Sequence, residues 1–249
     1  MARAVVLSGE VGDGLAAVAR ARRAYLVAPV LMAEQDRVSN AAVLFDRTGN
    51  VAGIYRKVHP VAALGEACLE DGVMPGTEFP VFACDFGRVG IQICWDMSYE
   101  DGWAELSRQG AELIALCSAS PQTIRPAAYA MRHRLYIVSS TPRDNVTVFN
   151  PVGMVEAQRT EPGVLVHTID LSHAVLHWSE RLEDGRALAR RYGDRVGYVY
   201  STREDTGLFW SNDPALPIGV VLRDLRLETM DEQIARCERM RHRALVVSE

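Results

Sequence analysis

The stretch Val89-Gly-Ile-Gln-Ile-Cys94-Trp-Asp-Met-Ser-Tyr-Glu-Asp-Gly-Trp-Ala-Glu-Leu106 decides the fold, because a strand pattern runs into a helix pattern within it. The apolar run before Cys94 is typical of a buried strand, and residues 99–109 predict a helix that Gly110 ends. Residues 112–118 form the next apolar run and predict another buried strand. Strand, turn, helix and strand in succession indicate an α/β fold.

Cys94 stands where the first of these strands ends, and this position suits a nucleophilic thiol. Backbone N–H groups and the positive end of a following helix favour the thiolate over the thiol. Free cysteine is also one of the most buried residue types, so a strand cysteine is more commonly part of the core. Cys94 is therefore a candidate nucleophile whose assignment depends on the residues that accompany it.

The chain before Cys94 predicts a helix followed by short strands. Helix formers cover residues 15–23, and Asp13 can cap that helix. Turn residues such as Arg47-Thr-Gly-Asn50 separate the apolar runs and indicate hairpins. The expected strands cover residues 24–30 (closed by Pro29), 41–46, 51–57 and, as a hairpin turning at Phe86-Gly-Arg88, 81–94.

Lys57 ends the hairpin of residues 41–57 and precedes a loop over residues 59–80 that is rich in glycine, proline and acids. Lys57 can point into a cleft as a fixed cation for an oxyanion, although a lysine at a strand end is more commonly solvated. Glu66 and Glu70 lie in a loop long enough to fold back over such a cleft. As for Lys57, a functional role for these two acids is indicated only by their combination with the other motifs.

The chain after residue 118 continues the α/β pattern and then changes style. A helix over residues 127–135 and strands over 136–140, 146–149, 153–157 and 163–170 complete a first domain, residues 1–171. The remaining residues, 172–249, predict a C-terminal helical extension that packs on the core or on a sister subunit. Its expected parts are a charged helix over 178–192, an aromatic loop over 207–214 and a charged helix over 231–244.

Composition restricts the class of partner. Apolar residues make up 48% and charged residues 24% of the 249, and no uninterrupted apolar run reaches the roughly 18 residues of a membrane span. The net charge of −5 argues against nucleic acid or an anionic membrane held by a basic surface. Five cysteines without paired spacing argue against a disulfide framework or a zinc site. We therefore expect a cytoplasmic protein whose partner is a small molecule or another protein.

Several separate motifs occur together in one order. They are Tyr55-Arg-Lys-Val-His59, an acid, Pro75-Gly76, Gly90-Ile-Gln-Ile-Cys94-Trp-Asp96 and Gly110-Ala-Glu-Leu-Ile114. In this order and spacing, over roughly residues 20–170, the chain resembles the nitrilase or carbon-nitrogen hydrolase superfamily. The resemblance implies a four-layer α-β-β-α sandwich, frequently dimerised through its sheets, so a homodimer or higher homo-oligomer is expected.

The resemblance also implies a cysteine-dependent enzyme that needs no metal and no organic cofactor. Cys94 would attack an amide, nitrile or carbamoyl carbon of a small molecule to give a thioester, which water hydrolyses. Lys57 would stabilise the oxyanion, and Glu70 would orient Lys57 and the substrate. Glu66, nine residues after Lys57, competes with Glu70 for that role.

The amino end admits two alignments with this family. In the first, residues 5–10 form an early strand whose final residue, Glu10, is the general base. In the second, residues 8–14 match a glycine-rich loop before the family's second helix, and the first strand, the first helix and the base are missing. We favour the second, which motivates alternatives to hydrolysis: a catalytically impaired member acting as a binding or assembly module, or an acyltransferase that uses the same thioester.

Other residues could carry chemistry but are better explained otherwise. Cys117 also ends a strand and is more simply a core or pocket-lining cysteine. His59 and His133 are expected on loop or helix surfaces, so a cysteine–histidine dyad is not our interpretation. Trp95, Trp103 and residues after 119 are expected to form the pocket walls. No Gly-x-Ser-x-Gly motif for a serine nucleophile occurs in the sequence.

Overall fold

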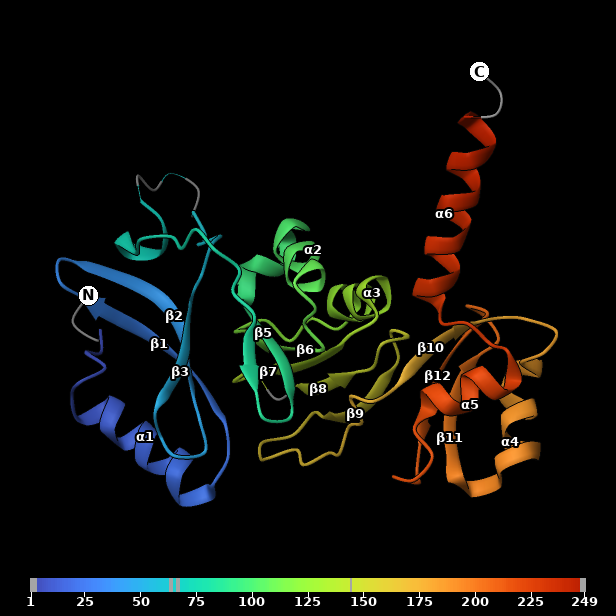
Figure 1. Cartoon of the computed structure of the whole chain (residues 1–249). Coiled ribbons are helices and arrows are strands. Elements are labelled where there is room, and N and C mark those ends of the chain that lie inside the picture. Colours follow the sequence, from blue (N-terminus) through green and yellow to red (C-terminus); the bar gives the residue numbers. More distant parts are fainter. Residues whose placement is uncertain (1–3, 63–64, 66–67, 144, 247–249) are drawn as a thin grey trace. The chain divides into compact units, whose positions relative to one another are not determined.

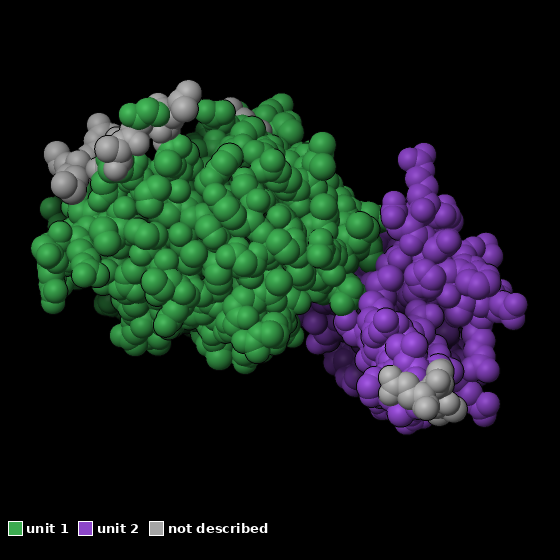
Figure 2. Space-filling view, turned by 90° about the horizontal axis from the view of Figure 1, so that it is seen from above, with its two compact units in different colours: residues 1–167 green, residues 168–249 purple. Residues whose placement is uncertain are grey.

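A computed structural model gives the structure of the protein and describes residues 4–62, 65, 68–143 and 145–246. The chain separates into two compact units, residues 1–167 and residues 168–249 (Figure 2). The sequence pattern placed this boundary after residue 171. Each unit has its own sheets and its own core and is described by itself below.

The first sheet of unit 1 is a three-stranded antiparallel meander. Its strands are β1 (Leu26–Glu34), β2 (Arg37–Phe45) and β3 (Val51–Arg56), in the order β1-β2-β3. Side chains of a strand alternate between the two faces of its sheet. In β2, Ala41, Val43 and Phe45 pack with Ala19 of helix α1 (Glu10–Arg22) in one core cluster. The helix therefore covers one face of this sheet.

The second sheet of unit 1 has six strands in the order β4-β5-β6-β7-β8-β9. Strands β5, β6 and β7 run parallel, and the outer pairs are antiparallel. Helices α2 (Asp101–Arg108) and α3 (Ile124–His133) follow β5 and β6 and cover the outer face with Trp103, Leu106 and Ala130. The strands are β4 (Phe82–Cys84), β5 (Gly87–Ile93), β6 (Leu113–Cys117), β7 (Tyr136–Ser140), β8 (Val146–Phe149) and β9 (Val155–Arg159).

The remaining faces of the two sheets meet in an inner core. Leu44 of β2 and Tyr55 of β3 pack there with Ile91 and Ile93 of β5. Unit 1 is thus layered as α1, the three-stranded sheet, the six-stranded sheet, and α2 with α3 (Figure 1). The predicted α-β-β-α sandwich is confirmed. Two 3-10 turns matter for the site below: η1 (Glu70–Gly72) and η2 (Cys94–Ser98).

Unit 2 was expected to be a helical extension, but it contains a three-stranded antiparallel sheet in the order β10-β12-β11, and the helix expected over residues 178–192 begins only at Arg186. Buried Leu188, Phe209 and Val221 belong to one core cluster, which joins the sheet to helices α4 and α5. Helix α6 has no buried residue. The elements are β10 (Ala174–His177), η3 (Glu183–Gly185), α4 (Arg186–Tyr192), η4 (Gly193–Arg195), β11 (Val196–Ser201), β12 (Thr206–Ser211), α5 (Ile218–Leu225) and α6 (Met230–Val246).

Three expectations about local structure were wrong. Pro29 does not close its strand, because at Pro29 β1 pairs only with β2, and a proline, which lacks an N–H group, is tolerated where one side of a strand is unpaired. The aromatic stretch after Thr206 is strand β12, where Leu208 and Phe209 are buried, and not a loop. Residues 163–170 form no strand, and Val164 and Val166 are 81% and 88% exposed.

The described helices include none that combines the length and the apolar character needed to cross a membrane.

The buried face of β6 provides a test of this layering. Ile114 is fully buried between the six-stranded sheet and its helices, whereas Ile124 at the start of α3 is 84% exposed. Ile114→Ala should lower the free energy of unfolding by about 2–5 kcal/mol, because the deleted atoms leave a cavity. The matched variant Ile124→Ala should change it by no more than about 0.5 kcal/mol. Urea unfolding followed by tryptophan fluorescence measures both, and equal effects would contradict the layering.

Candidate active site

Lys57 lies just beyond β3 with a side chain that is only 2% exposed. Its backbone N–H donates to the carbonyl oxygen of Asn40 at 2.8 Å, which continues the pairing of β2 with β3 past Arg56. Lys57 is also the only lysine among the 27 lysines and arginines of the sequence. A buried ammonium group is costly unless an opposite charge accompanies it.

Glu70 provides that charge. Its Oε1 accepts hydrogen bonds from the Lys57 ammonium group and, at 2.9 Å, from the Val61 backbone N–H, while Oε2 accepts from Asn40 Nδ2 at 2.9 Å. Burial acts to raise the pKa of Glu70, but the hydrogen bonds from Asn40 and Lys57 outweigh it and hold the pKa below its ordinary value. Glu70 is therefore a carboxylate at neutral pH, as the pairing with Lys57 requires.

Gly76 explains why the motif Pro75-Gly76 accompanies this pair. Its backbone N–H donates to the carbonyl oxygen of Lys57 at 2.8 Å. A Cβ atom on residue 76 would lie 2.2 Å from the carbonyl oxygen of Arg56, a distance that no side chain tolerates. Only glycine allows the returning loop to come this close, so Gly76 fixes the far end of the loop that carries Glu70.

Cys94 is the first residue of η2 and sits on a sharp turn directly after β5. Its φ angle is +46°, in the left-handed region that non-glycine residues rarely adopt. Such strain persists only where the surroundings hold it, and it is common at functional sites. The turn lifts the half-buried thiol out of the strand at the edge of the six-stranded sheet. The helix predicted over residues 99–109 is α2, which begins at Asp101 after η2.

Lys57, Glu70 and Cys94 line one pocket of about 540 Å³. No other charged residue lines it among the residues that the structure describes. The rest of the wall comes from the ends of β6 and β7, from β1 and from β2, and is small, polar or apolar. It consists of Pro29, Asn40, Ile93, Cys117, Ser118, Ala119, Ser140, Thr141 and Pro142.

Of the other two predicted acids the structure describes only Glu10, which is not found at this pocket. Glu10 does not end a strand: it is the exposed first residue of α1, and it does not line the pocket. Upstream of it only an isolated bridge joins Val5 to Met32. Glu66, the competitor of Glu70, lies outside the described residues. Among the described acids, Glu70 is thus the one that reaches Lys57.

Cys117 is a pocket-lining cysteine, as expected, and not a second nucleophile. Burial raises the pKa of its thiol to about 11, so it stays protonated at neutral pH. The tryptophans were misplaced: Trp103 is fully buried in the core under α2, Trp95 is 40% exposed, and neither lines the pocket. Ala119 does line it.

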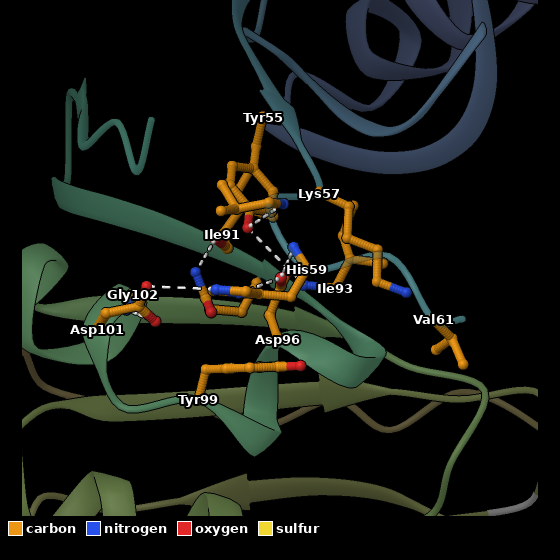
Figure 3. A network of polar contacts seen from close by, with 12 residues as sticks. Tyr55, Lys57, His59, Val61, Ile91, Ile93, Asp96, Tyr99, Asp101 and Gly102 are labelled. Carbon is orange, nitrogen blue, oxygen red and sulfur yellow. Dashed lines mark hydrogen bonds and ion pairs between the residues drawn. The ribbon is translucent and has the colours of Figure 1, made fainter. Parts of the chain in front are cut away.

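The histidines are less exposed than the sequence suggested. The side chain of His133 is 10% exposed and lies 3.2 Å from Glu100. The side chain of His59 is 17% exposed and meets the buried carboxylate of Asp96 (Figure 3). Sequence reasoning named Asp96 only as the last residue of a motif and gave it no role, although a weak signal was present: His59 and Asp96 each follow a proposed site residue at a spacing of two.

Among the described residues, no group of three or more His, Cys, Asp or Glu side chains is arranged to hold a metal ion.

The fold and the pocket define the class of protein: an α-β-β-α sandwich with a cysteine, a lysine and a glutamate in one pocket. The family model of the carbon-nitrogen hydrolases matches residues 1–175, and the chain belongs to this family. Human omega-amidase NIT2 is 27% identical over 188 residues, which cover 66% of this chain and 68% of that protein. Human deaminated glutathione amidase is 27% identical over 164 residues, which cover 56% of this chain and 50% of that protein.

Solved structures share the fold. A carbon-nitrogen hydrolase from Helicobacter pylori superposes with a TM-score of 0.54 at 18% identity, covering 60% of this chain and 62% of that one. An amidase variant from Nesterenkonia sp. AN1 in complex with butyramide gives a TM-score of 0.54 at 20% identity, covering 61% and 63%. These structures confirm the predicted fold. The family model and the relatives confirm the predicted family and its type of enzyme.

The Lys57–Glu70 pair makes stability depend on pH in one direction. Glu70→Gln leaves a buried ammonium group without its counter-charge and should lower the free energy of unfolding by about 3 kcal/mol at pH 7. Because the pKa of Glu70 is lowered on folding, its contribution is complete above about pH 4.3 and declines as the pH falls through the folded-state value.

Urea unfolding at pH 7 and in steps down to pH 3 measures this. The gap between the protein and Glu70→Gln should shrink as the pH drops, whereas the exposed-residue control Glu78→Gln should differ little from the unaltered protein at every pH. A gap of constant size from pH 7 to pH 3 would show that the ionised carboxylate of Glu70 is not what stabilises Lys57.

Proposed function

We propose that the protein hydrolyses a carbon–nitrogen bond of a small linear amide through a thioester on Cys94. The observation that carries the proposal is that Cys94, Lys57 and Glu70, on three separate segments, line one pocket in a chain of this family. The pocket of about 540 Å³ is of a size that holds a small molecule. Nitrile and carbamoyl groups also present an electrophilic carbon to a thiol and belong to the same test.

The chemistry assigns one task to each side chain. Cys94 Sγ attacks the carbonyl carbon, and the carbonyl oxygen, as it becomes an oxyanion, is stabilised by the ammonium group of Lys57. The carbon–nitrogen bond then breaks, and the nitrogen leaves as ammonia with the proton that the thiol gave up. Water attacks the thioester, releases the carboxylic acid and restores the thiol. Glu70, through its ion pair with Lys57, favours the charged form of the ammonium group and orients it toward the oxyanion.

The lysine itself supports this assignment. Arginine supplies every other cation among the 27 basic residues, yet this one position holds lysine. An ammonium group is a compact point charge, whereas a guanidinium group is a broad planar fork that suits carboxylates and phosphates. A single oxygen atom that develops charge in a confined pocket is better served by the ammonium group. We infer that the oxyanion is what this lysine serves.

A second candidate function rests on the position of Glu10. Since Glu10 is exposed on α1 and the pKa of Glu70 is lowered, no described carboxylate in the pocket has the raised pKa typical of a general base. A binding or assembly module that retains the pocket but turns substrate over slowly would have these features. A measurement of substrate turnover distinguishes the hydrolase from the binding or assembly module.

Ammonia release over a panel of butyramide, longer linear amides, nitriles and carbamoyl compounds provides the test. Cys94→Ala should abolish release, and Lys57→Ala should slow it by about 10²- to 10³-fold, as the loss of an oxyanion donor does. Cys84→Ala, a cysteine of β4 outside the pocket, is the matched control and should keep full activity. Intact-mass detection of an acyl adduct on Cys94 would confirm the thioester.

If Cys94→Ala or Lys57→Ala keeps full activity, the assignment is wrong. Binding of the panel compounds without measurable ammonia release would favour the binding module.

A further inference from the structure

The carboxylate of Asp96 is buried and lies at the centre of a polar network beside the proposed site (Figure 3). Asp96 does not line the pocket, so it is not placed to touch a substrate. Its Oδ2 accepts from Tyr55 Oη at 2.8 Å and from the Ile93 backbone N–H at 2.9 Å. Its Oδ1 accepts from the backbone N–H of His59 at 2.9 Å and lies 3.2 Å from His59 Nδ1.

These partners belong to the two segments that carry the proposed reacting groups. Tyr55 and His59 flank Lys57 at a spacing of two on either side, and Ile93 is the residue before Cys94. One carboxylate therefore joins the end of β3 in the first sheet to the end of β5 in the second. Oδ2 accepts from both segments, through Tyr55 and Ile93, and Oδ1 accepts from the segment of Lys57, through His59. Neither segment can therefore shift alone without losing a hydrogen bond.

We propose that Asp96 is a positioning residue that fixes Lys57 relative to Cys94, an inference that rests on the proposed function. It acts through the backbone: the bond to the Ile93 N–H holds the strained turn at Cys94, and the bonds to Tyr55 and His59 hold the strand end that carries Lys57. Reacting groups displaced by about 1 Å can lose 10²-fold in rate, so a fixed separation matters for catalysis.

His59 is itself held on its remaining sides. Its Nε2 lies 3.3 Å from Asp101 Oδ2, and its ring stacks on Tyr99 with centroids 3.9 Å apart and planes 7° apart. Phe79 lies against the ring as well, with centroids 6.0 Å apart. The charged groups that face His59 are thus Asp96 and Asp101. This packing leaves the imidazole one orientation, with Nδ1 toward Asp96.

Tyr55 is a dependable donor in this arrangement. It is fully buried, and burial together with the neighbouring Asp96 carboxylate raises the pKa of its hydroxyl far above its ordinary value. The phenol therefore keeps its proton and donates it to Asp96. A phenylalanine at position 55 would keep the ring in the inner core and remove only that hydrogen bond.

Asp96→Asn is the sharpest probe, because an amide keeps the shape and one accepting oxygen but places an NH₂ group against the donors on the other side. On the panel amide that the unaltered protein turns over fastest, kcat should fall about 10- to 100-fold with KM changed less than about threefold. Tyr55→Phe should lower kcat by about three- to tenfold. Tyr25→Phe, which removes a hydroxyl bonded to the Asp85 N–H, is the matched control and should change kcat less than twofold.

Two readouts test position without turnover. Since Lys57 is the only lysine, protein labelled with [¹³Cε]lysine gives a single side-chain NMR signal, which Asp96→Asn should shift and Tyr25→Phe should not. The rate at which iodoacetamide alkylates Cys94, measured by peptide mass spectrometry, should change at least threefold in Asp96→Asn. Alkylation of Cys237, an exposed cysteine of the other unit, should stay the same and is the internal control.

The outcomes separate this inference from the function on which it rests. Unchanged kcat, lysine signal and Cys94 alkylation in folded Asp96→Asn would overturn the positioning role while leaving the hydrolase intact. An unaltered protein that releases no ammonia would instead overturn the hydrolase, and the two spectroscopic and labelling readouts would still decide the positioning role. If Asp96→Asn does not fold, Tyr55→Phe decides it, and a Tyr55→Phe variant equal to Tyr25→Phe would overturn it.

Discussion

The buried ammonium group of Lys57 is the constraint on which the rest of the site depends. A charge taken out of water has to be compensated where it lies, and here the compensation comes from a carboxylate thirteen residues further along the chain. The loop after β3 must therefore turn back over the first sheet. Asn40 and the Val61 N–H hold the returning carboxylate, and Gly76 secures the end of the loop. The path of this loop, which forms one wall of the pocket, thus follows from the burial of the Lys57 ammonium group and its pairing with Glu70.

Asp96, two residues after Cys94, presents the opposite case of a buried negative charge. Asp96 is a buried anion whose burial raises its pKa, while the hydrogen bonds from Ile93, Tyr55 and His59 favour the charged form. The charge of Lys57 is thus balanced by Glu70, and that of Asp96 is stabilised by hydrogen bonds from residues beside Lys57 and Cys94. The two charges are not paired with each other. The described core cluster between the two sheets is built from apolar side chains, and the hydrogen bonds of Asp96 add a directional link between the end of β3 and the end of β5.

The sequence predicted the fold because its signals are local. The apolar run from Ala41 to Phe45 in β2 and the run from Val89 to Ile93 in β5 both identify strands without reference to the rest of the chain. Pro29 misled the prediction because what a proline does depends on whether its strand lies at an edge, and that is a tertiary fact. Likewise, the sequence of β12 suggested an aromatic loop, because its pairing with β10 on one side and β11 on the other is also a tertiary fact.

The site could be predicted only where a motif marked it. Lys57, Glu70 and Cys94 belong to motifs whose order identifies the family, and the structure brings them to one pocket. The contacts of Asp96 join positions 37 and 41 residues apart, and no periodicity or composition reports a contact of that kind. The choice of tryptophans as pocket walls failed for the same reason: nearness to Cys94 in sequence does not say which face of α2 Trp103 occupies.

The left-handed turn at Cys94 has a consequence for which nucleophiles this fold can host. A φ angle of +46° is acceptable for a residue with a simple Cβ when the surroundings hold it, but a β-branched side chain crowds its own backbone there. Threonine, which serves as a nucleophile in other hydrolases, is therefore disfavoured at this position by backbone geometry, whatever its reactivity. In this chain the turn at residue 94 favours a side chain with an unbranched Cβ atom, such as cysteine or serine.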